Sequence, residues 1–164
     1  MTANRFPSHL RLLGPGFKLV PGAVANVVAM PSRRRMASCD ELLDRLETIG
    51  ELAPDAPLSF LVVRVTGLLP DEHDDQLRRI SNRLADLLRG TDVVGQMHGH
   101  AFGIVLQGTG VVAAGAVAAR LTHHLNRMAE LSPSICITVS AATGTGKNAG
   151  TLATAAMESF EACC

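Results

Sequence analysis

The sequence has neither tryptophan nor tyrosine, and its few aromatic residues are five phenylalanines in 164 positions. Lysine is also scarce, with two lysines against thirteen arginines. Basic and acidic residues balance to a formal net charge of zero at pH 7. A neutral chain has no general electrostatic attraction to nucleic acid or to an anionic membrane, so we expect no nucleic-acid partner.

The sequence also lacks an apolar run long enough to cross a membrane. The run from Leu19 to Met30 is too short and is interrupted by Pro21-Gly22. No clean signal-peptide cleavage site follows it. We therefore expect no membrane span, a cytoplasmic location, and a lead-in segment over residues 1–25.

Cysteine is present four times but in no metal-binding pattern. Cys39 and Cys136 stand alone, and the adjacent pair Cys163-Cys164 is poorly placed to form a disulfide with itself. Reduced thiols and no bound metal are the expectation. A hydrophobic content of 47% over this length predicts a single domain with a substantial core.

Hydrophobic periodicity and capping residues predict an alternating series of helices and strands. Ser38 and Glu41 form a capping box that opens the first helix. The apolar run 58–65 predicts a buried central strand, in which Arg64 is the one charged residue. Gly90 is the predicted C-cap of the second helix. The remaining predictions are a helix over 71–88, strands over 93–97 and 102–106 around a tight turn, a helix over 110–128, a strand over 134–142, a glycine-rich loop over 143–150 and a helix over 151–163. This order predicts an α/β (α+β) fold with a mixed central sheet of about four to five strands flanked by helices.

Four short motifs follow one another along the chain: Val27-Val-Ala-Met-Pro31-Ser-Arg33-Arg34, the hairpin His98-Gly99-His100-Ala101-Phe102, Thr138-Val139-Ser140-Ala141-Ala142, and a closing helix from Ala155 to Cys163. Over residues 26–164 they resemble, in the same order, motifs of the GGDEF family of diguanylate cyclases. The first stands in place of "LTGLPNRR", the hairpin in place of Gly-Gly-Asp/Glu-Glu-Phe, and the third in place of "TVSiG". The resemblance implies a fold like that of nucleotidyl cyclases and the polymerase palm. It also implies a family chemistry in which two metal ions activate GTP.

The positions to which the resemblance assigns catalysis carry unsuitable residues here. Arg64 and His100 stand where the family has its metal-binding carboxylates, Ala101 replaces the second hairpin acid, and Cys163 replaces a phosphate-binding lysine. Arginine cannot ligate Mg²⁺, and histidine is a poor ligand for this oxygen-seeking ion. We therefore expect a degenerate domain without cyclase activity and without a cofactor.

A second family feature is kept. Arg89-Gly-Thr-Asp92, with Arg120 on the following helix, matches the Arg-x-x-Asp inhibitory site that binds cyclic di-GMP in the family. Arginine suits phosphate and guanine edges, and Asp92 can accept hydrogen bonds from guanine. The alternative is that Arg89 complements the helix dipole and Asp92 caps the loop, with no ligand.

Two other patterns have weaker functional meaning. His98 and His100 form a His-x-His pair whose rings would share one side of a strand, but no third metal ligand is evident. The segment 142–150 resembles a phosphate-binding loop but lacks its first glycine and its final Ser/Thr.

The sequence thus predicts a regulatory pseudoenzyme that binds cyclic di-GMP through Arg89, Asp92 and Arg120. The alternative is a nucleotide-independent interaction module, with a protein partner or a second copy docking on it. A third alternative is an enzyme of altered chemistry at Arg64, His98 and His100.

Overall fold

A computed structural model describes residues 35–129 and 134–161 of the chain. The predicted boundary at residue 25, the Pro31-Ser-Arg33-Arg34 motif and Cys163 lie outside these residues. The elements are α1 (Cys39–Leu52), β1 (Pro57–Thr66), α2 (His73–Leu87), β2 (Val93–Met97), β3 (Ala101–Gln107), α3 (Val111–Ala129), β4 (Cys136–Thr145), the short 3-10 helix η2 (Gly146–Asn148) and α4 (Ala149–Glu161). In the described part of the chain, no helix combines the length and the apolar character that a membrane crossing requires.

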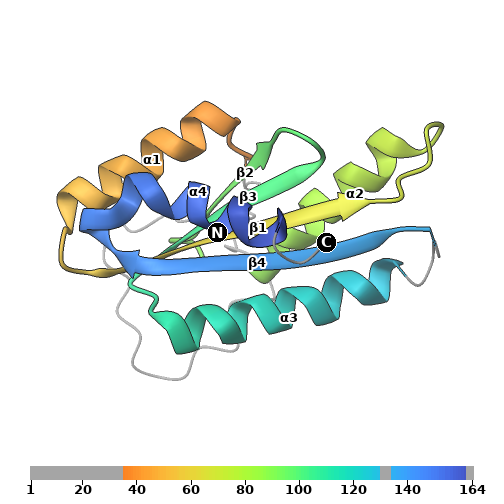
Figure 1. Cartoon of the computed structure of the whole chain (residues 1–164). Coiled ribbons are helices and arrows are strands. Elements are labelled where there is room, and N and C mark those ends of the chain that lie inside the picture. The colour runs from red at the N-terminus through yellow and green to blue at the C-terminus, as the bar shows by residue number, and fades with distance from the viewer. Residues whose placement is uncertain (1–34, 130–133, 162–164) are drawn as a thin grey trace, which may run out of the picture. The chain divides into compact units, whose positions relative to one another are not determined.

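The four strands form one sheet in the order β2-β3-β1-β4, and each neighbouring pair is antiparallel. The parallel pairing found among the described residues is an isolated bridge between Ala37 and Gly95 at the β2 edge. The expected α+β class with helices flanking a central sheet is confirmed (Figure 1).

Side chains alternate along β1, so the two faces of the sheet have separate cores. Leu61, Val63 and Val65 pack with α2 and α3, on what we call the α2/α3 face. Phe60 and Val62 pack with α1 and α4, on the α1/α4 face. Figure 1 shows α3 along one side of the sheet and α1 with α4 along the other. Both faces of β1 are therefore buried, as its continuous apolar sequence predicted.

The predicted start of α1 is confirmed in detail. Ser38 Oγ accepts a hydrogen bond from Glu41 N at 3.2 Å, and Glu41 Oε2 accepts one from Ser38 N at 2.9 Å. The two bonds satisfy backbone donors that a helix start leaves without partners. Leu42 and Leu46 then turn inward to the α1/α4 face.

Two predicted boundaries are wrong. Helix α2 ends in an extended Leu88, and Gly90 does not have the positive φ of a glycine C-cap. The segment expected as a loop over 143–150 instead continues β4 to Thr145 and then forms η2 and the first turn of α4. The strand continues because β1 is ten residues long and pairs with it to the end, at Leu58–Gly144 and Pro57–Thr145.

Candidate functional site

The hairpin between β2 and β3 turns through His98, Gly99 and His100. Its last ladder pair is Met97–Ala101. Gly99 and His100 both have positive φ, at 68° and 59°, which suits the right-handed twist of a tight hairpin. The predicted hairpin is thus confirmed, but both histidines lie in the turn and not on a strand.

Arg64 lies on the α1/α4 face, half-buried near the end of β1 and paired with Ala101 on one side and Thr138 on the other. It borders a cavity of about 280 Å³ between α1, α4 and the sheet. The residues lining this cavity are Cys39, Leu43, Leu46, Glu47, Val62, Arg64, Met97, His98, Ala101, Gly150, Ala153, Thr154 and Met157. Glu47 is the one carboxylate among them, so Arg64 brings positive charge to a largely apolar hollow.

The imidazole of His100 lies elsewhere, beside α2. Its two ring nitrogens are each 3.1 Å from Nε2 of His73, the first residue of α2. Arg64 and His98 therefore border the cavity on the α1/α4 face, whereas His100 meets the helix that covers the other face. The expectation that His98 and His100 share one side is wrong, because the positive φ of two successive turn residues redirects the chain between them.

No three His, Cys, Asp or Glu side chains among residues 35–129 and 134–161 are grouped so that they could hold a metal ion. The two positions to which the resemblance assigns metal binding are neighbours in the backbone, where the Val65 N–H donates to the His100 carbonyl at 3.1 Å, but neither supplies a carboxylate: Arg64 borders the cavity, and the His100 ring contacts His73. The side chain of Cys163 lies outside the described residues.

The structure brings Arg89, Asp92 and Arg120 together at the C-terminal end of α2. Asp92 is 7% exposed, and its Oδ2 accepts a hydrogen bond of 2.8 Å from the backbone N–H of Arg89. Arg120 reaches across from α3, and its Nη2 donates to the carbonyl of Leu87 at 2.9 Å. Asp92 thus caps the loop as the ligand-free alternative proposed, while the exposed Arg89 and Arg120 flank the same helix end.

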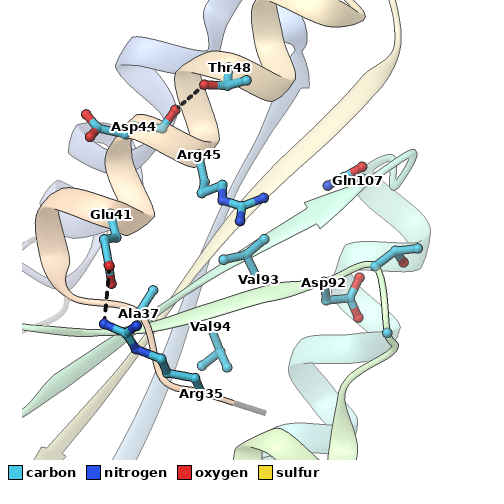
Figure 2. A pocket seen from close by; sticks show the side chains of 12 residues that line it. Arg35, Ala37, Glu41, Asp44, Arg45, Thr48, Asp92, Val93, Val94 and Gln107 are labelled. Carbon is cyan, nitrogen blue, oxygen red and sulfur yellow. Dashed lines mark hydrogen bonds and ion pairs between the residues drawn. The ribbon is translucent and has the colours of Figure 1, made fainter. Parts of the chain in front are cut away.

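Asp92 also borders a larger hollow of about 620 Å³ between α1 and β2 (Figure 2). On the α1 side of this hollow, Arg45 points toward β2, and Nη2 of Arg35 lies 3.4 Å from Oε1 of Glu41. The pKa of Glu41 lies below its ordinary value, chiefly because the Ser38 backbone N–H donates to its carboxylate and secondly because Arg35 is nearby. Sequence reasoning did not single out Arg45, because an exposed arginine on an amphipathic helix carries no signal of what lies opposite.

Comparison with known proteins agrees with this architecture. A family profile described as diguanylate cyclase, GGDEF domain, matches residues 71–161, which run from the approach to α2 to the end of α4. No curated protein matches the chain.

Three solved structures of similar fold are all distant in sequence. The active GGEEF domain of a diguanylate cyclase from Vibrio cholerae is 18% identical, with a TM-score of 0.58 over 67% of this chain and 78% of that one. A DGC protein from Thermotoga maritima is 19% identical, with a TM-score of 0.56 over 79% and 95%. The FimX GGDEF domain from Pseudomonas aeruginosa is 15% identical, with a TM-score of 0.59 over 80% and 90%. The family profile covers more than half of the chain, so this chain belongs to the GGDEF domain family.

Proposed function

We propose that the chain is a catalytically inactive GGDEF domain that acts as a cytoplasmic receptor for cyclic di-GMP. The observation that carries the proposal is the convergence of Arg89, Asp92 and Arg120 on one helix end, although they are separated by up to 31 positions in the sequence. A receptor needs only these residues, and it does not need the metal ligands of a cyclase.

The inactive part of the proposal rests on the cavity beside Arg64. Two-metal phosphoryl transfer needs carboxylates that hold divalent ions against the developing negative charge. This cavity is instead lined by a guanidinium, with Glu47 as the one carboxylate among its described lining residues, and the hairpin contributes His98 and Ala101. A positive side chain at this point repels metal ions, and it offers no oxygen ligand where the resemblance places a carboxylate.

The receptor part rests on the donors at the end of α2. A guanidinium has five N–H donors, and the bond from Arg120 to the Leu87 carbonyl uses one of them. Arginine pairs with phosphate oxygens or with the O6/N7 edge of guanine through two parallel hydrogen bonds. Asp92 holds the loop that presents Arg89, so we assign it a positioning role and assign the ligand contacts chiefly to the two arginines.

Isothermal titration with cyclic di-GMP tests the receptor. Wild type should bind, and Arg89→Ala and Arg120→Ala should each weaken binding by at least tenfold, or about 1.4 kcal/mol. Arg127→Ala is the matched control, because Arg127 is also exposed on α3 but lies two turns beyond Arg120. No binding by wild type at ~100 μM, or an equal loss in the control, contradicts the receptor.

A GTP turnover assay with Mg²⁺ or Mn²⁺ tests the inactive state separately. We expect no cyclic di-GMP or linear intermediate above the rate without protein. Steady product formation would show that the domain is a cyclase in spite of Arg64.

A nucleotide-independent interaction module is the second candidate. Val111 and Val112, adjacent in the first turn of α3, are 70% and 88% exposed. Adjacent exposed valines are consistent with a docking surface, although they form a small one. The molar mass of the full chain, measured by light scattering with and without cyclic di-GMP, distinguishes the two candidates. A dimer whose mass does not change when the nucleotide is added favours the interaction module.

A further inference from the structure

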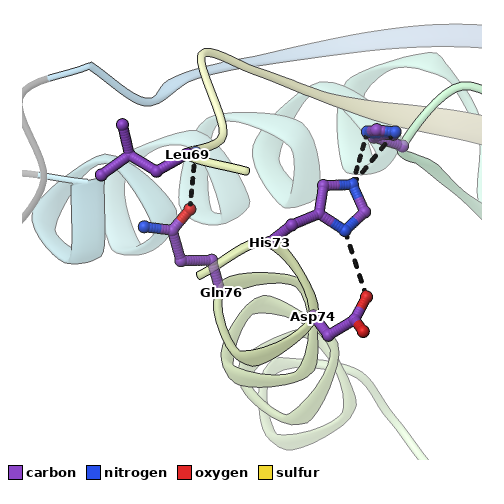
Figure 3. Close-up of polar contacts among 5 residues, drawn as sticks. Leu69, His73, Asp74 and Gln76 are labelled. Carbon is purple, nitrogen blue, oxygen red and sulfur yellow. Dashed lines mark hydrogen bonds and ion pairs between the residues drawn. The ribbon is translucent and has the colours of Figure 1, made fainter. Parts of the chain in front are cut away.

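The contact between His73 and His100 joins two segments that are 27 residues apart in sequence. Figure 3 shows His73 at the start of α2 with its contact to Asp74. Nε2 of His73 is 3.1 Å from both ring nitrogens of His100, the ring centroids are 4.3 Å apart, and the planes meet at 77°. On its other side, His73 Nδ1 lies 3.1 Å from Oδ1 of Asp74. His73 was not singled out from the sequence, because nothing there shows that the hairpin comes near the start of α2.

We propose that this pair binds a divalent transition-metal ion of the kind that prefers imidazole, with zinc as its representative. Zinc–nitrogen bonds are about 2.0–2.1 Å, so nitrogens 3.1 Å apart on one ion would subtend an angle of about 100° at the metal. That angle lies between the octahedral and tetrahedral values. His100 is exposed, so its ring can turn to direct one nitrogen lone pair at the ion.

Asp74 supplies the outer partner that such a ligand requires. A metal-bound histidine typically donates its second ring N–H to a carboxylate, which fixes the tautomer and makes the ligating nitrogen more basic. The contact between His73 Nδ1 and Asp74 Oδ1 has this arrangement and leaves Nε2 to face the ion.

Local charge also favours a cation. A hollow beside His73 is lined by Pro70, Asp71, His73, Asp74 and Asp75. The N-terminal end of the α2 dipole is unfavourable to a cation, but Asp74 and Asp75 in the first turn oppose it.

The protein contributes two ligands, since no group of three or more metal-binding side chains occurs in the described part of the chain. Water completes the coordination, and binding is accordingly modest. The site lies beside α2, and it shares His100 with the positions to which the resemblance assigns metal binding, whereas its other ligand, His73, is not one of them and Arg64 takes no part. It goes beyond the proposed receptor function and does not depend on it, because none of Arg89, Asp92 and Arg120 takes part.

Titration of the full chain with zinc tests the site. Wild type should show a saturable site, and His73→Gln and His100→Asn should each weaken it by at least tenfold. Asparagine is chosen at position 100 because it tolerates the positive φ found there. His98→Asn is the matched control, since His98 is exposed in the same turn but borders the Arg64 cavity.

All variants keep the same cysteines, so zinc bound by thiols would appear equally in each of them. Zinc should also raise the melting temperature of wild type and the control but not of the other two variants. A dissociation constant for zinc of ~1 mM or weaker overturns the proposal. So does unchanged binding in either His73→Gln or His100→Asn, or a similar loss of binding in His98→Asn.

Discussion

Gly103 in β3 lies against Leu42 of helix α1, and replacing it with alanine should destabilise the fold. A β-carbon at this position would lie 2.4 Å from Leu42 Cδ2, 2.8 Å from Met97 Sδ and 2.8 Å from Phe60 Cζ. The ends of Leu42 and Met97 can move, but Phe60 is fully buried, so its ring can shift only against closely packed neighbours. Overpacking of this kind costs about 1–3 kcal/mol.

Gly115→Ala is the matched control, because Gly115 lies within α3 and has nothing within 4 Å of the added carbon. Alanine in an exposed helix interior should stabilise by about 0.5–1 kcal/mol. Urea unfolding followed by circular dichroism measures both changes, since the chain has no tryptophan or tyrosine for intrinsic fluorescence. If Gly103→Ala were as stable as wild type with an unchanged m-value, the close approach of α1 to β3 would be wrong.

Two further predictions concern titrating groups. The Ser38 backbone N–H and the nearby Arg35 lower the pKa of Glu41, so its capping contribution is complete above the ordinary value of 4.5 and is lost as the pH falls through the lowered one. Ser38→Ala should cost about 1 kcal/mol of stability, because it removes the side-chain acceptor of the Glu41 N–H. Arg35→Ala should raise the pKa of Glu41 only part of the way in an NMR titration, because the Ser38 backbone N–H still donates to the carboxylate; a return to the ordinary value would contradict that hydrogen bond as the larger cause. The pKa of His124 lies below 6.5 chiefly because of burial, and secondly because Nη2 of Arg83 lies 3.4 Å from its Nδ1. Arg83→Ala should therefore raise the pKa of His124 only part of the way. Full recovery in that variant would show that burial is not the larger cause.

Local sequence signals predicted most of the elements. The Ser38–Glu41 capping box, the apolar run of β1 and the tight turn after Met97 are each specified by residues close together in the chain. The end of β4 was missed because a glycine-rich segment has no strand signal of its own. Its extended form depends on pairing with Pro57 and Leu58, almost ninety residues earlier.

The residues of the candidate site were predictable from the sequence, but their hydrogen bonds were not. The resemblance identified Arg89, Asp92 and Arg120, and the structure brings them to one helix end. It was not foreseen that Arg120 donates to the Leu87 carbonyl, because that bond depends on how α3 packs against α2. The separation of His98 from His100 depends on backbone angles of two turn residues, which the sequence pattern does not encode.

The turn at Gly99 directs two histidines to opposite sides of one sheet. This arrangement depends more on the length of the turn than on which residues form it. Inserting or removing one residue there would shift the register of a ladder whose side chains alternate, and each histidine would face the wrong neighbours. Point replacements within the turn can alter the chemistry on one side alone. Loops grafted into this hairpin should therefore keep three residues between Met97 and Ala101 if either side is to be redesigned independently.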